Sequence, residues 1–132
     1  MTASEHEDFV RQLFQLVHEE APAWEIEHGS IDRTAAGHEV HGPWQRTDCA
    51  AVLVRWAQGG LLGIMSHEGW PGRNTRKLPA SQVDQILSAP DDWPKIPLSD
   101  EAVWWSLHPT DRGLTRQPTD WIALATPTTD DG

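Results

Sequence analysis

A chain of 132 residues is long enough to bury one hydrophobic core, and 38% hydrophobic with 23% charged residues is typical of a folded protein. The 20 acidic and 10 basic residues give a net charge of −10 at pH 7, which disfavours nucleic acid or an anionic membrane as partner and favours a basic protein. No apolar run approaches the roughly 18 residues of a membrane helix, and the acidic N-terminus does not resemble a secretion signal. We therefore expect a single globular domain over residues 1–132, located in the cytoplasm.

The aromatic and thiol contents are unusual. The chain has 8 Trp, 2 Phe and no Tyr, so nearly all its aromatic surface is indole, and each buried indole N–H requires an acceptor. The single Cys49 excludes an internal disulfide, argues against a thiolate zinc site and indicates a reducing compartment.

The first element expected is an amphipathic helix over residues 4–20. Ser4 and Glu7 have the spacing of a capping box, and apolar residues then recur every three or four positions. Ala21-Pro22 ends this helix. After it, residues 24–28 alternate apolar and charged side chains and predict a strand, and residues 38–41 are a weaker strand candidate.

A hairpin over residues 50–67 is the element around which the sheet is expected to form. Two short apolar runs flank Gly59-Gly60, and glycine supplies the positive φ that a two-residue hairpin turn requires. This turn would place Trp56 opposite Gly63 and Val52 opposite His67.

The second half of the chain predicts a loop from residue 67 to residue 77, a helix over 80–88 and a second short helix over 100–108 that Ser99 caps. Residues 120–126 predict a closing strand, and residues 127–132 a frayed tail. The expected fold is α+β: an antiparallel sheet of four or five strands centred on hairpin 50–67, packed by an N-terminal helix and two short C-terminal helices.

Negative charge concentrates at the two ends of the sequence. Residues 1–48 hold 10 acidic and 3 basic residues, residues 49–98 hold 4 and 5, and residues 99–132 hold 6 and 2. The ends therefore supply the acidic surface and the middle supplies the scaffold.

The seven histidines raise the question of a metal site, with His38 and His41 as the candidates, His67 and His28 as possible further ligands, and Glu39 or Glu68 as a carboxylate ligand. Residues three apart on a strand face opposite ways, so His38 and His41 converge only at a turn or bulge. We expect no metal, and no motif for a cofactor is present.

Catalytic groups are weakly marked. Cys49 enters an apolar run and suits a small buried hydrophobe better than a nucleophile, and Ser66-His67-Glu68 cannot form a relay among strand neighbours. Glu25 and Glu27 would share one strand face about 7 Å apart, which suits either two-carboxylate chemistry or a solvated edge. We assign no catalytic residue.

The segment from residue 70 to residue 77 is the strongest binding candidate. It joins an indole to the one local basic cluster, through Trp70, Arg73, Asn74, Arg76 and Lys77. These cations can seat an anionic ligand or pair with the acidic helix of the same chain. Trp93 and Trp105 are added as binding residues, because so many indoles are not expected to fit one small core.

These features predict a small acidic interaction protein, such as an inhibitor or a bacterial immunity protein that neutralises a basic effector, for example a nuclease toxin. A nucleic-acid mimic of the phage type belongs to the same acidic class. The alternative is a small-ligand binding domain with a Trp-lined pocket and residues 73–77 as a lid. A small hydrolase or metal-dependent enzyme is third, and would need His67 or His41 within hydrogen-bonding reach of a carboxylate inside a cleft.

Overall fold

The computed structural model describes residues 2–126, apart from the side chains of residues 30 and 32, and it combines helices with two antiparallel sheets. One sheet is the two-stranded hairpin β1-β2, and the other has three strands in the order β4-β3-β5. The tail expected at 127–132 lies outside the described residues. The elements in chain order are α1 (Ala3–His18), α2 (Ala23–Ile26), β1 (Ser30–Thr34), β2 (Gly37–His41), α3 (Arg46–Gln58), β3 (Leu62–Glu68), β4 (Arg73–Lys77), α4 (Ala80–Leu87), a 3-10 turn (Pro90–Asp92), β5 (Val103–Pro109), α5 (Asp111–Leu114) and α6 (Pro118–Ala125).

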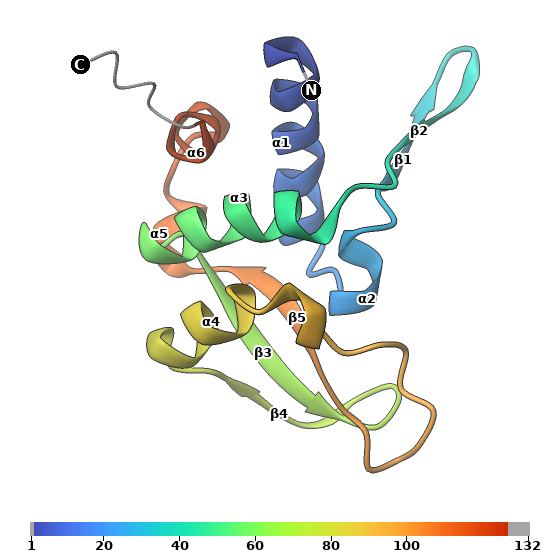
Figure 1. Ribbon diagram of the computed structural model, residues 1–132, viewed down its shortest axis with the longest axis vertical. Helices are drawn as coiled ribbons and strands as arrows, with labels where there is room; N and C mark the ends of the chain where they lie inside the picture. Colours follow the sequence, from blue (N-terminus) through green and yellow to red (C-terminus); the bar gives the residue numbers. More distant parts are fainter. Residues whose placement is uncertain (1, 127–132) are drawn as a thin grey trace.

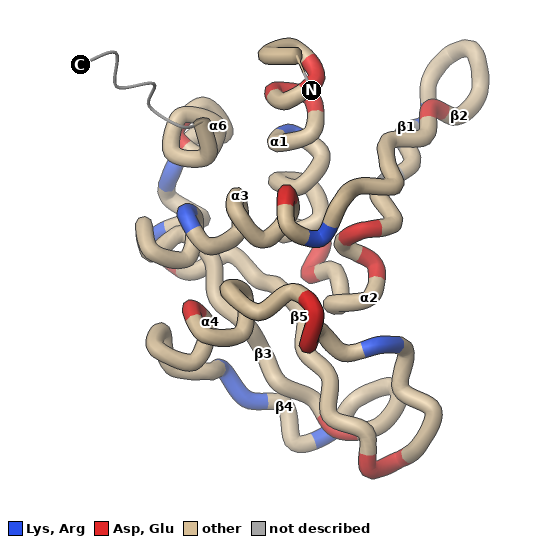
Figure 2. Tube along the Cα trace, in the orientation of Figure 1, with Lys and Arg blue, Asp and Glu red and all other residues tan. Residues whose placement is uncertain are grey.

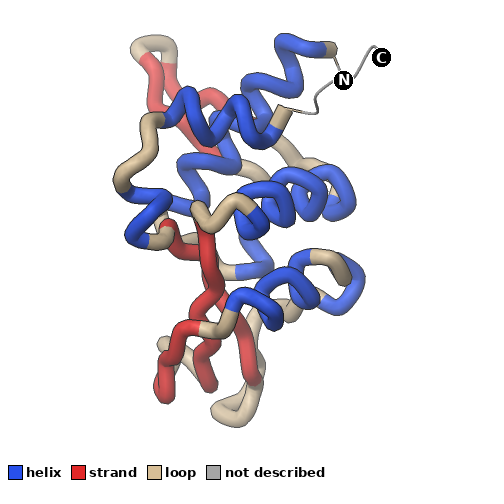
Figure 3. Tube along the Cα trace, turned by 90° about the vertical axis from the view of Figure 1, so that its left-hand side faces the viewer, coloured by secondary structure: helices blue, strands red, loops and turns tan. Residues whose placement is uncertain are grey.

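Helix α3 crosses the middle of the molecule, with α1 and α6 on one side of it and the three-stranded sheet with α4 on the other (Figure 1). Figure 3 shows the same division from the side. The core lies where these elements meet, and its fully buried side chains include Leu13, Val17, Leu53, Trp56, Ile64, Leu107 and Trp121.

The helix expected over residues 4–20 is confirmed as α1, although its N-cap differs. Thr2 rather than Ser4 caps it, because the Thr2 hydroxyl accepts the N–H of Glu5 at 3.1 Å. The apolar stripe that includes Phe9, Leu13 and Leu16 is buried, as the spacing predicts.

The hairpin expected at 50–67 is wrong in its first half, because residues 46–58 form the helix α3. The buried positions recur at intervals of three and four residues, which is a helical stripe, and they are Cys49, Val52, Leu53 and Trp56. Alanine is the strongest helix former, and the alanines of this stretch outweigh the β-branched valines.

The glycine pair after α3 ends this helix instead of turning a hairpin. Gly60 has φ +78°, its N–H donates to the carbonyl of Ala57, and the N–H of Leu61 donates to the carbonyl of Trp56. These two bonds and the positive φ form a Schellman motif. The strand that follows, β3, pairs with β5 instead, so that His67 lies opposite Trp104 and not opposite Val52.

The helix expected over 100–108 is also wrong, because residues 103–109 form β5. Residues 104–108 are all buried, because the strand is covered on both faces: Trp104 packs against Trp24 of α2, and Trp105 on the opposite face packs against Trp93. A strand buried on both faces has no alternation, and its periodicity resembles that of a buried helix.

The strand expected at 120–126 is helix α6. Pro118 occupies its first turn, and Gln117 and Asp120 form a capping box in which each side chain accepts the other's backbone N–H. The strand expected at 24–28 is likewise replaced by the short helix α2. The helix expected over 80–88 is confirmed as α4, and the strand expected at 38–41 is confirmed as β2.

The structure has two sheets where one sheet of four or five strands was expected. The residues of β2 are exposed on both faces, apart from the partly buried His41, so this hairpin has no apolar face to bury against the larger sheet. The loop expected through residue 77 ends earlier, because residues 73–77 form the edge strand β4.

Candidate functional site

The predicted basic binding segment is divided between a turn and a strand. Trp70 lies in the turn between β3 and β4 and is 64% exposed. The other four predicted residues are exposed on β4, where Arg73 donates to the carbonyl of Asp100 at 2.7 Å and Asn74 donates to the carboxylate of Glu68 at 2.9 Å. Arg73 therefore holds the loop before β5, and Asn74 links the adjoining ends of β3 and β4. Arg76 and Lys77 form no ion pair with any of the residues that the structure describes.

Trp93 and Trp105 are both buried and pack edge to face, with ring centroids 5.5 Å apart. Trp93 also donates its indole N–H to the carbonyl of Ile86 at 2.9 Å, so its polar atom is satisfied inside the fold. The expectation that these indoles would be surplus to the core is therefore not met, and their role in binding stays a prediction.

Three other indoles gather at one end of the three-stranded sheet. Trp104 is buried on β5, and its ring lies 5.0 Å from the ring of Trp24 on α2 and 5.6 Å from that of Trp70. The Trp104 indole N–H donates to the carbonyl of Gly69 at 2.6 Å, which fixes the turn that carries Trp70. His67 stacks on the other side of the cluster, 4.2 Å from Trp104.

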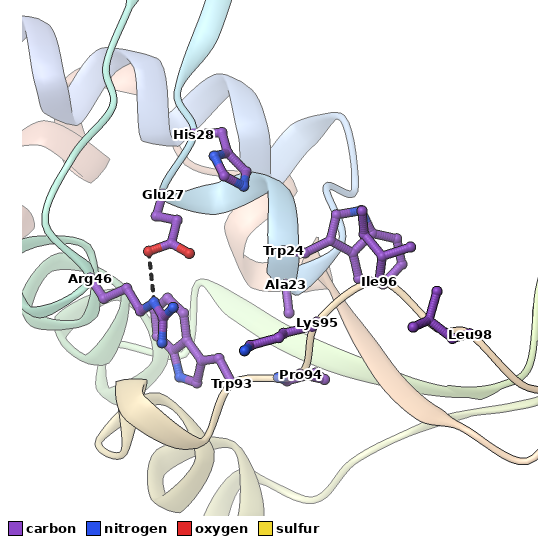
Figure 4. Close-up of a pocket in the computed structure, with 10 residues that line it drawn as sticks. All are labelled: Ala23, Trp24, Glu27, His28, Arg46, Trp93, Pro94, Lys95, Ile96 and Leu98. Atoms are coloured by element: carbon purple, nitrogen blue, oxygen red, sulfur yellow. Dashed lines mark hydrogen bonds and ion pairs between the residues drawn. The ribbon is translucent and has the colours of Figure 1, made fainter.

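The segment after the 3-10 turn extends this aromatic surface. Ile96 is 61% exposed and Leu98 is 95% exposed, and both line a cavity of about 330 Å³ together with Trp24. In Figure 4 the side chains of Trp24, Ile96 and Leu98 lie together at one end of this cavity. We define the tryptophan patch as Trp24, Trp70, Ile96 and Leu98.

The opposite end of the cavity is charged. The carboxylate of Glu27 accepts a 2.6 Å hydrogen bond from Nε of Arg46, and this bond together with the negative charge raises the pKa of Arg46. Figure 4 shows Arg46 beside the ring of Trp93, with Lys95 and His28 also at the rim. Lys95 forms no ion pair with any carboxylate of residues 2–126.

Acidic residues border the tryptophan patch. Glu25 is exposed on α2, and Asp100 and Glu101 are exposed in the loop that precedes β5. This loop packs on the turn of Trp70, because the N–H of Gly69 donates to the carbonyl of Ala102 and Arg73 holds the carbonyl of Asp100. The loop that carries Asp100 and Glu101 therefore neighbours the turn that carries the exposed indole.

The predicted catalytic candidates are not assembled into a site. Burial raises the pKa of the Cys49 thiol to about 12, with further contributions from Asp48 and Glu27, so Cys49 is not a thiolate nucleophile at neutral pH. Glu25 and Glu27 do not share a strand face, since residues 23–26 form a helix and Glu27 is paired with Arg46.

The histidine candidates for a metal or catalytic site contact hydroxyl groups at His67 and the carboxylates of Asp8 and Glu39 at His41. A ring nitrogen of His67 lies 2.8 Å from Thr75 Oγ1, and the other lies 2.8 Å from Ser106 Oγ. Ser106 is buried, and its backbone forms an isolated β-bridge with Pro22. His41 Nδ1 lies 3.1 Å from a carboxylate oxygen of Asp8 at a hollow between α1 and the hairpin, but no serine, threonine or cysteine lines that hollow. Among the side chains that the structure describes, no three His, Cys, Asp or Glu residues are grouped as metal ligands.

Sequence reasoning missed Trp24, Ile96 and Leu98. Trp24 was assigned to a strand, and the proline-rich segment that carries the other two has no periodicity that would mark it as exposed or buried. The available signal was two large aliphatic residues on either side of Pro97, in a segment too short to form its own core.

No protein family model matches this chain, and neither the curated proteins nor the solved structures contain a significant match. None of the helices described is long and apolar enough to span a membrane.

Proposed function

We propose that this chain is a small acidic interaction protein that binds a basic protein through the tryptophan patch. The observation that carries the proposal is that Ile96 and Leu98 are exposed at the cavity that Trp24 lines, and that the exposed ring of Trp70 lies 6.0 Å from the ring of Trp24. Exposed apolar side chains that adjoin one another mark interaction surfaces, whereas isolated ones need no explanation.

The composition of the patch is that of a binding hot spot. Tryptophan contributes the most to alanine-scanning hot spots, and it does so where neighbouring contacts exclude water. Trp70 rests on Trp24 and Trp104, so its ring is held in place before a partner arrives. A pre-positioned ring loses less side-chain entropy on binding than a free one.

The charge of the molecule supports a basic partner. Ten acidic residues lie before residue 49, and Asp100 and Glu101 lie beside the patch. A net charge of −10 accelerates encounter with a positively charged protein, and the carboxylates at the rim then complement its surface. An inhibitor or bacterial immunity protein for a basic effector, such as a nuclease toxin, has this chemistry, and we propose that it acts in the cytoplasm.

The experiment is to recover complexes from the source cells with the tagged chain and to measure association with the recovered partner by surface plasmon resonance. We expect a basic protein whose association rate falls steeply as salt rises. Trp70→Ala and Leu98→Ala should each weaken binding by roughly tenfold or more, as truncation of a hot-spot residue does.

Leu114→Ala is the matched control, because Leu114 on α5 is 63% exposed and lies outside the patch. It should leave the affinity unchanged. The proposal fails if no basic partner is recovered, if the association rate is indifferent to salt, or if the patch variants bind as tightly as the control.

A second candidate is a small-ligand site in the same cavity, favoured by the two indoles of Trp24 and Trp93 that line it. The cations at its rim are Arg46 and Lys95, and not the residues 73–77 expected as a lid. A native mass spectrum of the recovered protein distinguishes the two, because a bound small mass that Trp24→Ala removes supports the ligand and a protein complex supports the docking surface.

A further inference from the structure

A second cavity, of about 420 Å³, lies apart from the tryptophan patch and shares no lining residue with it. Its walls come from the end of α3, the start of β3, helix α4 and helix α5, which lie together on one side of the molecule in Figure 1. Apolar side chains form much of its surface, among them Leu62, Leu78 and Val83. The volume falls within the range of natural small-molecule sites.

A buried histidine lines this cavity with one unsatisfied nitrogen. His108 is only 6% exposed, and its Nδ1 lies 3.1 Å from the carbonyl of Pro109. A carbonyl only accepts, so Nδ1 carries the proton and Nε2 of the neutral ring is an acceptor. Within the described chain Nε2 has no hydrogen-bond partner. Nε2 therefore offers the cavity a free acceptor, and a ligand hydroxyl that donates to it gains a hydrogen bond.

Glycine at position 63 makes room for this ring. His108 lies opposite Gly63 in the strand pairing, and a Cβ at Gly63 would lie 2.8 Å from His108 Nε2. Both residues line the cavity, so the bare strand backbone and the imidazole edge face it together.

Two cations and one carboxylate stand at the same cavity, and they are Lys77, Arg112 and Asp111. Neither Lys77 nor Arg112 forms an ion pair within residues 2–126. The local balance is one net positive charge, in a protein whose net charge is −10. Such a balance fits a ligand with a single negative charge.

The wall between α3 and α5 is built before any ligand arrives. The Thr110 hydroxyl donates to the carbonyl of Gly60 and accepts the N–H of Gly113 at 3.0 Å, while the N–H of Thr110 donates to Leu61. A Cβ at Gly113 would overlap the carbonyl of Leu61, so glycine permits this close approach. A pre-formed wall reduces the ordering cost of binding.

We propose that this cavity binds a small organic carboxylate that has an apolar body and a hydroxyl group. The carboxylate is held by Lys77 and Arg112, the body contacts Leu62 and Val83, and the hydroxyl donates to His108 Nε2. This site is independent of the proposed docking surface.

The test follows backbone amide shifts in proton–nitrogen correlation spectra during titration with two probes, meta-hydroxyphenylacetate and ω-hydroxyhexanoate. At least one probe should shift the amides of Gly60 and Gly63 saturably. Its neutral amide and its analogue without the hydroxyl should each bind roughly tenfold more weakly, because each lacks one strong hydrogen-bonding group.

Substitutions test which side chains bind the carboxylate and the hydroxyl of the probe. Lys77→Gln and Arg112→Gln should weaken the probe by roughly tenfold each, whereas Arg33→Gln, on the hairpin β1-β2, should leave its affinity unchanged. Gly63→Ala displaces the His108 ring and should abolish the preference for the hydroxylated probe, and the two glutamine variants carry the test if that chain does not fold.

The proposal is overturned if neither probe shifts Gly60 and Gly63 saturably, if the neutral amide binds as tightly as the carboxylate, or if both glutamine variants retain full affinity. None of these outcomes bears on the partner complex, so this proposal and the proposed function fail separately.

Discussion

His67 lies between two hydroxyl groups and on the face of an indole. Its burial disfavours the charged imidazolium and lowers the pKa of His67 below the ordinary value of 6.5, and the carboxylate of Glu20 opposes this shift without reversing it. The ring is therefore neutral at neutral pH, and it links β3 to β4 through Thr75 and to β5 through Ser106.

The lowered pKa predicts a loss of stability on acidification. Below about pH 6.5 the unfolded chain binds a proton at His67 that the folded chain does not. The free energy of unfolding therefore decreases as the pH is lowered, until the pH lies below the pKa of His67 in the folded chain. His67→Gln removes this contribution and leaves the other six of the seven histidines in place. The measurement is urea unfolding of both chains between neutral and acid pH.

The difference in unfolding free energy between the native chain and His67→Gln should shift against the native chain as the pH falls through this window. A difference that stays constant, or that moves in favour of the native chain on acidification, contradicts the assigned direction of the pKa shift.

At the scale of the elements, the contact between α3 and α6 depends on two indoles. Trp56 is fully buried, its ring packs edge to face on Trp121 with centroids 5.1 Å apart, and its N–H donates to the Trp121 carbonyl at 2.7 Å. Trp121 in turn donates to the carbonyl of Gly113 at 3.2 Å, which connects α6 to α5. Both indole donors are therefore satisfied inside the core.

Trp56→Phe should lower the free energy of unfolding by about 2–4 kcal/mol, because it leaves a cavity and an unpaired carbonyl in the core. Trp70→Phe is the control, since the exposed indole of Trp70 should tolerate the change within about 0.5 kcal/mol. Urea unfolding followed by circular dichroism measures both. If Trp56→Phe lowered the free energy of unfolding as little as the control does, the α3–α6 contact would contribute little to stability.

The sequence predicted those elements whose local signals agree with their packing. Helix α1 has one apolar stripe and lies against the core on that stripe, and α4 is similar. In α3 the signals disagree, because valines and a glycine pair favour a hairpin while the positions that become buried have helical spacing. Strand β5 is covered on both faces, and this depends on segments distant in sequence, so local periodicity could not reveal it.

The candidate site was predictable only in part, for the same reason. Trp70 is exposed as its turn-rich surroundings suggest, but its neighbours Trp24 and Ile96 come from segments that meet only after folding. Trp105 could not be placed from sequence, because an indole in a core and an indole at an interface have the same local pattern.

At the scale of the whole molecule, charge is unevenly distributed over the fold. Carboxylates concentrate on α1, α2 and the start of the hairpin, whereas the exposed edge strand β4 carries Arg73, Arg76 and Lys77 (Figure 2). Charged side chains on an edge strand oppose pairing with another sheet. The free edge is therefore guarded against aggregation.

The hairpin β1-β2 projects from this body (Figure 1). Removing it tests whether the hairpin is part of the proposed docking surface. Ser30 and His41 are directly paired at its base, so two glycines in place of residues 31–40 complete a two-residue turn. Because the remaining contacts of the core are untouched, the free energy of unfolding should change by less than about 0.5 kcal/mol.

The shortened chain should also retain the partner complex, since the tryptophan patch lies on α2 and the loops around the three-stranded sheet. The measurements are urea unfolding and surface plasmon resonance with the recovered partner, beside Trp56→Phe as the destabilised reference. Loss of binding with stability unchanged would move the docking surface to the hairpin, where Ile31 and Val40 form an exposed cross-strand pair. Loss of stability would instead show that residues 31–40 contribute to the fold, for which the retained His41, in contact with Asp8 of α1, is then not sufficient.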